Sequence, residues 1–215
     1  LMGQRLRITF ARGGAASYLS HLELMRMWER AFRRAGWRLA YSQGFNPHPR
    51  LSFAAPLPVG VAGEAELLEV YLEKPRPVGQ ARQELGEQMP AGVIVRAVEE
   101  VPVEEPVIQR RMVAAEYLAI PPDGESPDSL RREVERVVAA ASLPRERVRE
   151  GKARSYDLRP MIRSASVEET KEGRVELRMT LRTDAQGAGR PDEVLRELGI
   201  DPAECRITRL RLVLG

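Results

Sequence analysis

The chain has 215 residues, of which 43% are hydrophobic and 30% charged, a balance typical of a folded globular protein and not of a disordered one. No apolar run approaches the roughly 20 residues that a membrane-spanning helix needs, and no N-terminal signal pattern is visible, so we expect a cytoplasmic protein with no membrane partner. The single cysteine, Cys205, excludes an internal disulfide and a self-contained, cysteine-ligated iron–sulfur cluster.

Charge is distributed unevenly along the first half of the chain. Residues 1–50 contain nine arginines against two glutamates, whereas residues 51–105 contain four basic and ten acidic side chains. The first stretch therefore predicts a basic surface that attracts phosphates, although charge alone does not establish nucleic-acid binding.

The first predicted elements are a strand and a helix. Leu6, Ile8 and Phe10 alternate with polar or charged residues, which predicts a strand with one buried and one solvent-exposed face. Apolar residues then recur at three- and four-residue spacing, which predicts the buried face of a helix that ends before Gly36. That face comprises Tyr18, Leu22, Met25, Trp28, Phe32 and Ala35.

The start and the outer side of this helix carry polar signals. Ser20 and Glu23 fit a capping box, and Ser17 is an equally suitable N-cap. Arginines gather on the side opposite the apolar face, where a solvated surface is the commonest explanation and phosphate contact is the alternative. They are Arg26, Arg30, Arg33 and Arg34.

A constrained loop follows at 41–50, with the sequence Tyr-Ser-Gln-Gly-Phe-Asn-Pro-His-Pro-Arg. Pro47 and Pro49 fix their own φ and push Asn46 and His48 towards extended geometry. His48 is therefore expected in a stiff frame, among groups able to bind a phosphate, a base edge or a partner peptide. Those groups are Ser42, Gln43, Asn46 and Arg50.

The remaining elements of the first half complete a βαββαβ order, and a second set follows an acidic connector at 99–106. The first set comprises strands at 51–53, 67–72 and 93–98 and a helix at 81–88. The second comprises strands at 112–120, 175–181 and 207–214, helices at 127–141 and 191–198, and an extended region at 155–168. We predict an α+β protein with two tandem ferredoxin-like units, 1–105 and 106–215, each an antiparallel sheet with helices on one face.

Four segments between Arg5 and Gly60 have a specific sequence: Arg5-Leu-Arg-Ile-Thr-Phe, Tyr18-Leu-Ser-His-Leu-Glu-Leu-Met, Glu29-Arg-Ala-Phe-Arg-Arg-Ala-Gly and Tyr41-Ser-Gln-Gly-Phe-Asn-Pro-His-Pro-Arg-Leu-Ser-Phe-Ala. They closely resemble the radical-SAM-linked protein family of uncharacterised bacterial domains, with a weaker second signature at 152–162. Members are typically encoded beside, or fused to, a radical SAM protein. The resemblance implies a partner that carries an iron–sulfur cluster and S-adenosylmethionine, no cofactor in this chain, and no assigned activity. Glu23 stands where the family usually has aspartate, so the carboxylate is retained.

The two histidines, His21 and His48, are the candidates for acid–base catalysis. His21 lies in the first turn of the predicted helix, a position that suits a structural role as well as a functional one. His48 has the better functional case because its loop is stiff. With Glu23 they lack a metal-ligand spacing such as His-x-x-x-His, so no metal site is predicted.

A second basic segment combines Lys152, Arg154 and Arg159 with Tyr156, a mixture able to hold a single-stranded backbone and to stack a base. The alternative is a solvated loop in which Tyr156 packs on the sheet and Asp157 pairs with a neighbouring arginine. We favour nucleic-acid contact for Lys152 and Arg154, and the structural role for Asp157.

Three functional hypotheses follow. The favoured one is a module without catalysis of its own that recruits tRNA, ribosomal RNA or a ribosome-bound substrate for the radical SAM partner. The others are a metal-independent RNA-processing enzyme with His48 as base, assisted by His21 or Tyr41, which rests on fold analogy alone, and a protein-docking domain for that partner. The predicted RNA-contacting residues are Arg26, Arg30, Arg33, Arg34, Gln43, Asn46, His48, Arg50, Lys152, Arg154, Tyr156 and Arg159.

Overall fold

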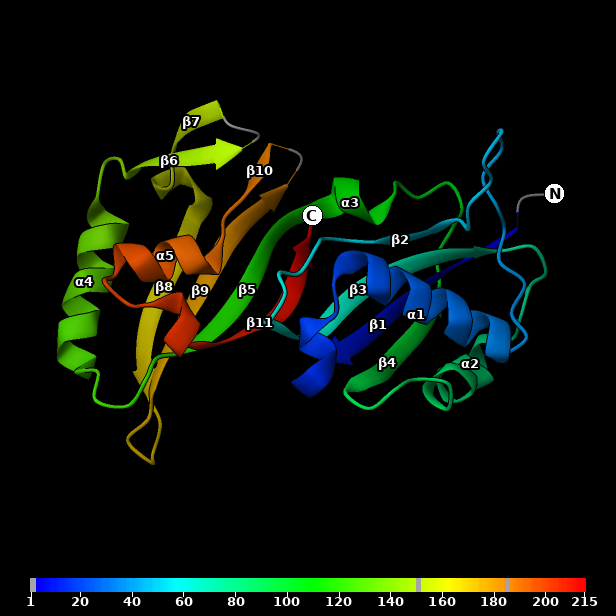
Figure 1. The fold of residues 1–215 in the computed structure, drawn as a ribbon, viewed down its shortest axis with the longest axis horizontal. Helices are drawn as coiled ribbons and strands as arrows, with labels where there is room; N and C mark the ends of the chain where they lie inside the picture. The colour runs from blue at the N-terminus through cyan, green and yellow to red at the C-terminus, as the bar shows by residue number, and fades with distance from the viewer. Residues whose placement is uncertain (1–2, 150–151, 185) are drawn as a thin grey trace. The chain divides into compact units, whose positions relative to one another are not determined.

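The computed structural model describes residues 3–149, 152–184 and 186–215, and the chain divides into two compact units, Leu1–Arg111 and Met112–Gly215 (Figure 1). Both units combine antiparallel strands with helices, which confirms the expected α+β class. Residues 106–111, which the sequence pattern placed in the second unit, belong to the first. No helix within the described ranges is long and apolar enough to cross a membrane.

The first unit contains four strands with helices in the two crossovers. Its elements are β1 (Gln4–Arg12), a 3-10 turn η1 (Gly14–Tyr18), α1 (His21–Arg34), β2 (Leu51–Phe53), β3 (Ala62–Leu72), α2 (Val78–Gly86), β4 (Val93–Glu100) and the short α3 (Ile108–Arg111). β1 pairs with β3 and β4, and β2 pairs with β3, all antiparallel. The strands therefore lie in the order β4-β1-β3-β2.

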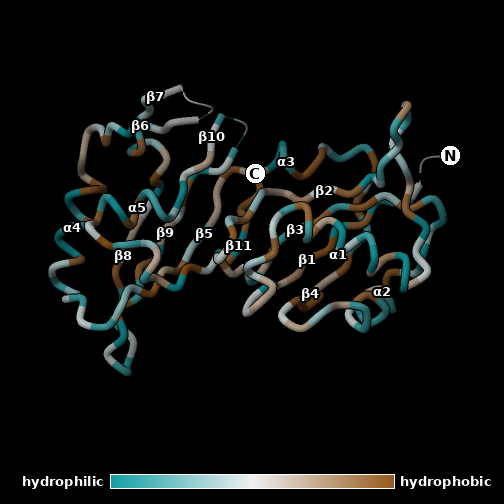
Figure 2. The backbone as a smooth tube through the Cα atoms, viewed as in Figure 1, coloured by the Kyte–Doolittle hydropathy of each residue, from teal (hydrophilic) through white to brown (hydrophobic). Residues whose placement is uncertain are grey.

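The helices α1 and α2 pack on one face of this sheet. Leu6, Ile8 and Phe10 of β1 are fully buried against them, and Phe10 meets Trp28 of α1 edge-to-face with ring centroids 5.1 Å apart. In Figure 2, hydrophobic and hydrophilic stretches alternate along α1, as expected for an amphipathic helix.

The buried face of α1 differs from the one expected. It consists of Leu24, Met27, Trp28, Ala31 and Phe32. Tyr18 and Leu22, expected on it, are 69% and 58% exposed. The helix begins only at His21, which leaves Tyr18 in η1, and Leu22 precedes Trp28 by six residues, which places it about 120° around the helix.

The second face of β1 is also buried, contrary to the expected exposed face. Arg5 is 0% exposed and Arg7 8%, because Glu69 of the neighbouring β3 pairs with both arginines. One carboxylate oxygen of Glu69 lies 2.7 Å from Arg5 Nη2 and the other 2.9 Å from Arg7 Nη2. Arg12 at the end of β1 is buried as well, so three of the nine arginines in residues 1–50 do not contribute to a basic surface.

The segment between β4 and α3 covers this second face. Arg5 donates from Nη1 to the carbonyl oxygens of Pro102 and Glu105, and from Nη2 to that of Pro106. The Ile108 amide donates to Glu69, with the nitrogen 3.3 Å from Oε2. These bonds explain why residues 106–111 belong to the first unit.

The second unit has four main strands and an inserted hairpin. Its elements are β5 (Met112–Ile120), α4 (Pro127–Ala139), β6 (Pro144–Arg149), β7 (Lys152–Asp157), η2 (Arg159–Met161), β8 (Ile162–Glu169), β9 (Val175–Asp184), β10 (Gly187–Ala188), α5 (Pro191–Glu197), η3 (Pro202–Glu204) and β11 (Arg206–Leu214). β5 pairs with β9 and β11, and β8 pairs with β9, all antiparallel. The main strands therefore lie in the order β11-β5-β9-β8.

The extended region expected at 155–168 is two strands. β7 pairs with β6 as a separate hairpin, and β8 joins the main sheet. The turn η2 separates them, with Pro160 in its first positions. A proline cannot donate to a strand ladder, so one continuous strand is interrupted there.

Replacing Glu69 with glutamine is expected to destabilise the first unit by about 3 to 5 kcal/mol, because two buried guanidinium groups lose their charge partner. Both tryptophans, Trp28 and Trp37, lie in this unit, so tryptophan emission during urea unfolding measures its stability. The control Glu87→Gln alters an exposed carboxylate of the same unit and should change stability by no more than about 0.5 kcal/mol. Equal unfolding midpoints for the two variants would contradict the proposed dependence on Glu69.

Candidate nucleic-acid interface

A capping box fixes the start of α1. The Ser20 side chain accepts a hydrogen bond from the Glu23 amide, while the Glu23 carboxylate accepts from the Ser20 amide at 2.8 Å and from its hydroxyl at 2.6 Å. These bonds lower the pKa of Glu23 below its ordinary value of 4.5. Ser20, and not Ser17, is therefore the N-cap, and the Glu23 carboxylate is committed to the helix start.

The outer face of α1 presents arginines to solvent. Arg26, Arg30, Arg33 and Arg34 are all exposed. Arg34 donates from Nε to the side-chain oxygen of Gln88 at 3.2 Å and from Nη2 to the Gln88 carbonyl. Within the described part of the chain, Arg26, Arg30 and Arg33 form neither a hydrogen bond nor an ion pair. Their guanidinium groups are free to contact a ligand.

A groove runs along one side of this arginine face and has a volume of about 550 Å³. Three arginines one helical turn apart form its α1 wall, and small or apolar residues form the opposite wall. Glu23 is the acidic residue in the lining, and its carboxylate is engaged in the cap. The groove is therefore basic. The lining residues are Arg26, Arg30, Arg34, Met27, Glu23, Ala15, Ala16, Leu19, Pro90 and Ala91.

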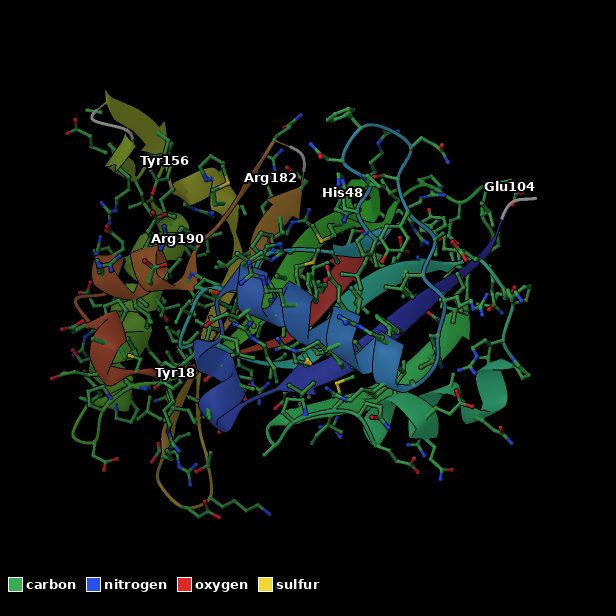
Figure 3. All side chains as sticks on the ribbon, turned by 45° about the vertical axis from the view of Figure 1, so that its right-hand side comes forward. Tyr18, His48, Glu104, Tyr156, Arg182 and Arg190 are labelled. Atoms are coloured by element: carbon green, nitrogen blue, oxygen red, sulfur yellow. The ribbon has the colours of Figure 1, made fainter. Side chains whose placement is uncertain are left out.

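The loop 41–50 is braced at its base. The Ser42 amide donates to the His48 carbonyl at 2.8 Å, and the His48 amide donates to the Ser42 hydroxyl at 3.1 Å. Tyr41 and Pro49 form an isolated β-bridge, and the Arg50 amide donates to the Ala40 carbonyl at 2.7 Å. Figure 3 labels His48 on this loop. The His48 backbone is therefore hydrogen-bonded across the base of the loop, in line with the frame expected there.

A second, smaller pocket of about 280 Å³ connects α1 to the loop. Arg33 of α1 and Arg38 after the helix line it together with Tyr41 and Pro49 of the loop. Glu29 and Glu73 are its acidic residues. Arg33 is therefore the arginine of the α1 face that lies next to the loop. The face and the loop belong to the same unit.

Arg50 at the end of the loop is exposed but lies against the sheet. Its guanidinium lies over the ring of Tyr71 in β3, 3.7 Å from the centroid, a distance typical of a cation–π contact. The planar guanidinium keeps edge donors available while its face covers the ring. Arg50 therefore helps to fasten the loop to the sheet.

The two histidines occupy different surroundings. The His21 ring meets Phe53 of β2 edge-to-face, with centroids 5.4 Å apart. The His48 ring is exposed. Within the described residues, neither imidazole forms a hydrogen bond that would orient it as a base, and no group of three His, Cys, Asp or Glu side chains is placed to hold a metal ion. Catalysis by His48 stays a prediction.

The second basic segment lies in β7 and η2 of the other unit, where Figure 3 labels Tyr156. Asp157 Oδ1 accepts from the Leu143 amide at 2.7 Å and the Arg159 amide at 2.9 Å, and these bonds lower the pKa of Asp157. Arg159 donates to the carbonyl oxygens of Val138 and Ile162. Both side chains fasten the chain around η2, whereas the side chains of Lys152 and Arg154 lie outside the described part.

Two residues of the first unit were missed in the sequence analysis. Phe45, at the tip of the loop, is 100% exposed, and Arg38 is exposed beside Arg33. The exposure of Phe45 could have been inferred from its place between Gly44 and Asn46. Besides Phe45, the only apolar side chains of this loop are the two prolines and Tyr41. The sequence pattern around Arg38 predicts only a short extended segment after α1 and gives no sign that this arginine is exposed beside Arg33.

The cap of α1 predicts a pH dependence. Because the pKa of Glu23 is lower in the folded chain than its ordinary 4.5, its stabilising contribution is complete above that value and is lost as the pH falls through the lowered one. The stability difference between wild type and Glu23→Gln should therefore be present at neutral pH and shrink below pH 4.5. Urea unfolding followed by tryptophan emission across this range measures it; a difference that persists unchanged in acid would contradict the assignment.

The comparisons with known proteins identify a family and a fold. Residues 5–191 match the model of a family described as "Uncharacterized protein conserved in bacteria (DUF2344)", and no curated protein matches. A solved chain titled "Crystal Structure of a Cbf5-Nop10-Gar1 Complex" is similar at 12% identity with a TM-score of 0.52, over 96% of this chain and 48% of that one. Our chain therefore spans about half the length of that neighbour.

A second solved chain, titled "Crystal structure of putative glycine cleavage system transcriptional repressor", matches at 12% identity with a TM-score of 0.30, over 100% of both chains. At 12% identity and a TM-score of 0.52, the likeness to the first solved chain concerns the fold and not the activity, and the second, at 0.30, supports no fold assignment. The family match covers most of the sequence, including α1, the loop and the second basic segment. The chain belongs to the uncharacterised bacterial family DUF2344.

Proposed function

We propose that this chain is an accessory RNA-binding module that recruits an RNA substrate for a radical SAM partner. The proposal of RNA binding rests on one observation. Arg26, Arg30 and Arg33 are exposed on one face of α1 and form no hydrogen bond or ion pair with any described residue. Unpaired guanidinium groups on a rigid helix suit phosphate oxygens, which they contact through several N–H donors.

Arginines elsewhere in the structure contrast with this face. Arg178 pairs with Glu168 and Glu176, and Arg211 pairs with Glu116. In such pairs a nearby carboxylate neutralises the guanidinium, so the local potential is small. Arg26, Arg30 and Arg33 form no such ion pair with a described residue, although Glu23 lies near Arg26 and Glu29 lines a pocket with Arg33, so arginines outnumber carboxylates on that face.

The architecture favours contact on the helix side. We infer that the two units are ferredoxin-like folds in tandem, supported by the strand orders β4-β1-β3-β2 and β11-β5-β9-β8. RNA-recognition motifs of similar topology bind RNA on the open face of the sheet. In the first unit the segment that follows β4 occupies that face and is bonded to Arg5. An RNA strand is therefore expected on α1 and the loop.

The partnership with a radical SAM protein rests on the sequence resemblance of Arg5–Gly60. Radical SAM chemistry requires an iron–sulfur cluster held by cysteine thiolates, and burial raises the pKa of Cys205, the single cysteine, to about 11. One cysteine cannot supply the several thiolates that hold such a cluster. The cluster in this proposal therefore belongs to the partner.

Replacing Arg26, Arg30 and Arg33 with alanine should weaken RNA binding without unfolding the protein, since all three side chains are exposed. For a single strand, the slope of log affinity against log salt should become shallower by about 0.7 for each phosphate contact removed. Mobility-shift titrations at several salt concentrations measure both quantities.

The matched control removes three arginines that are ion-paired on helices of the second unit, in the variant Arg131→Ala, Arg136→Ala, Arg196→Ala. It changes the net charge equally. If both triple variants lose the same affinity, the binding reflects net charge and the α1 surface is excluded; unchanged binding by the α1 variant also refutes the proposal.

A further inference from the structure

The loop 41–50 carries a fully exposed aromatic ring at its tip. Phe45 is 100% exposed, whereas the next most exposed large hydrophobic residue described, Tyr18, is 69% exposed. Gln43 and Asn46 on either side are exposed as well, and within the described residues their amide groups have no hydrogen-bond partner. The tip therefore presents one apolar ring between two groups that can both donate and accept hydrogen bonds.

The base of the loop limits how far this tip moves. Ser42 and His48 exchange two hydrogen bonds across it, and Arg50 joins it to β3 through the Tyr71 ring. A ring presented from a braced loop loses little conformational entropy on binding. This favours a role in recognition over that of an unconstrained surface residue.

We propose that Phe45 stacks on an unpaired nucleobase of the RNA, with Gln43 and Asn46 placed to bond the edge of that base. The inference rests on the proposed RNA-binding function and specifies its ligand as single-stranded RNA. Aromatic rings stack on any unpaired base, and side-chain amides bond exposed base edges. In duplex RNA the bases are already stacked, so the ring has no access to them.

The loop itself carries no charge that would repel a nucleic acid. Residues 41–50 contain no carboxylate, and the adjoining pocket places Arg33 and Arg38, together with Glu29 and Glu73, next to Tyr41. A strand whose base lies on Phe45 thus has cationic groups close by for its phosphates. A hydrophobic pocket of a protein partner would be better matched by large apolar neighbours, whereas residues 43–48 are Gln-Gly-Phe-Asn-Pro-His and include no other large apolar side chain.

Binding to two short oligomers of equal length separates base stacking from phosphate contact: single-stranded oligoadenylate, and the same backbone with every base removed. Phe45→Ala should lower affinity for oligoadenylate about 5- to 150-fold, while affinity for the abasic oligomer and the salt dependence stay unchanged. The triple arginine variant should instead weaken binding to both oligomers. The exposed phenyl ring makes no packing contribution, so Phe45→Ala is expected to fold normally.

A direct signal comes from Phe45→Trp. Both natural tryptophans are buried, Trp28 at 0% and Trp37 at 4% exposure, so the introduced indole reports separately from solvent. Oligoadenylate should quench its emission, whereas the abasic oligomer should not. Val59→Trp, at another exposed apolar position of the same unit, is the control and should show no quenching.

The outcomes are distinguishable. Loss of oligoadenylate affinity in Phe45→Ala together with quenching in Phe45→Trp supports stacking. Normal binding by Phe45→Ala without quenching overturns it and leaves the arginine-based proposal standing. Failure of the wild-type protein to bind either oligomer overturns both proposals.

Discussion

The buried pairing of Glu69 with Arg5 and Arg7 is the constraint on which the first unit depends. Two guanidinium groups leave water together, and one carboxylate pairs with both of them. The remaining Arg5 donors meet the carbonyl oxygens of the segment after β4, so the ion pair also holds that segment over the sheet. Buried charges tolerate few alternatives, because any other arrangement leaves a charge without a partner.

This constraint also closes one face of the first unit's sheet. The face of β1 and β3 that could have bound a ligand is filled by Arg5, Arg7, Glu69 and the covering segment, whereas α1 presents arginines to solvent. The capping box fixes the first turn of α1, and the helix then spaces Arg26, Arg30 and Arg34 one turn apart along the groove. The braced loop adds Phe45, Gln43 and Asn46 to the same unit. The contacts that we propose for phosphates and for a base thus come from two elements of one unit.

Local sequence patterns predicted most helices and strands correctly, but predicted less accurately which of their faces are buried. The capping box at Ser20, the alternation in β9 and the proline-braced loop rest on contacts between neighbours in sequence, and the structure contains all three. The exposed face expected for β1 was wrong because alternation cannot show whether a charged residue meets water or a carboxylate on another strand. The buried face of α1 was shifted since apolar Tyr18 and Leu22 fit the spacing but lie outside the packed stripe.

The sequence by itself determined the α+β class, most of the strands and helices, membership of an uncharacterised bacterial family, and the arginine-rich helix followed by a proline-containing loop. Tertiary structure decided which arginines reach solvent. Arg5 and Arg7 form ion pairs with Glu69, a residue more than sixty positions away in the chain, and Arg159 donates to two backbone carbonyls. Arg26, Arg30 and Arg33 have no such partner among the described residues. A charge becomes available for binding only when no partner distant in sequence neutralises it, and that depends on the fold.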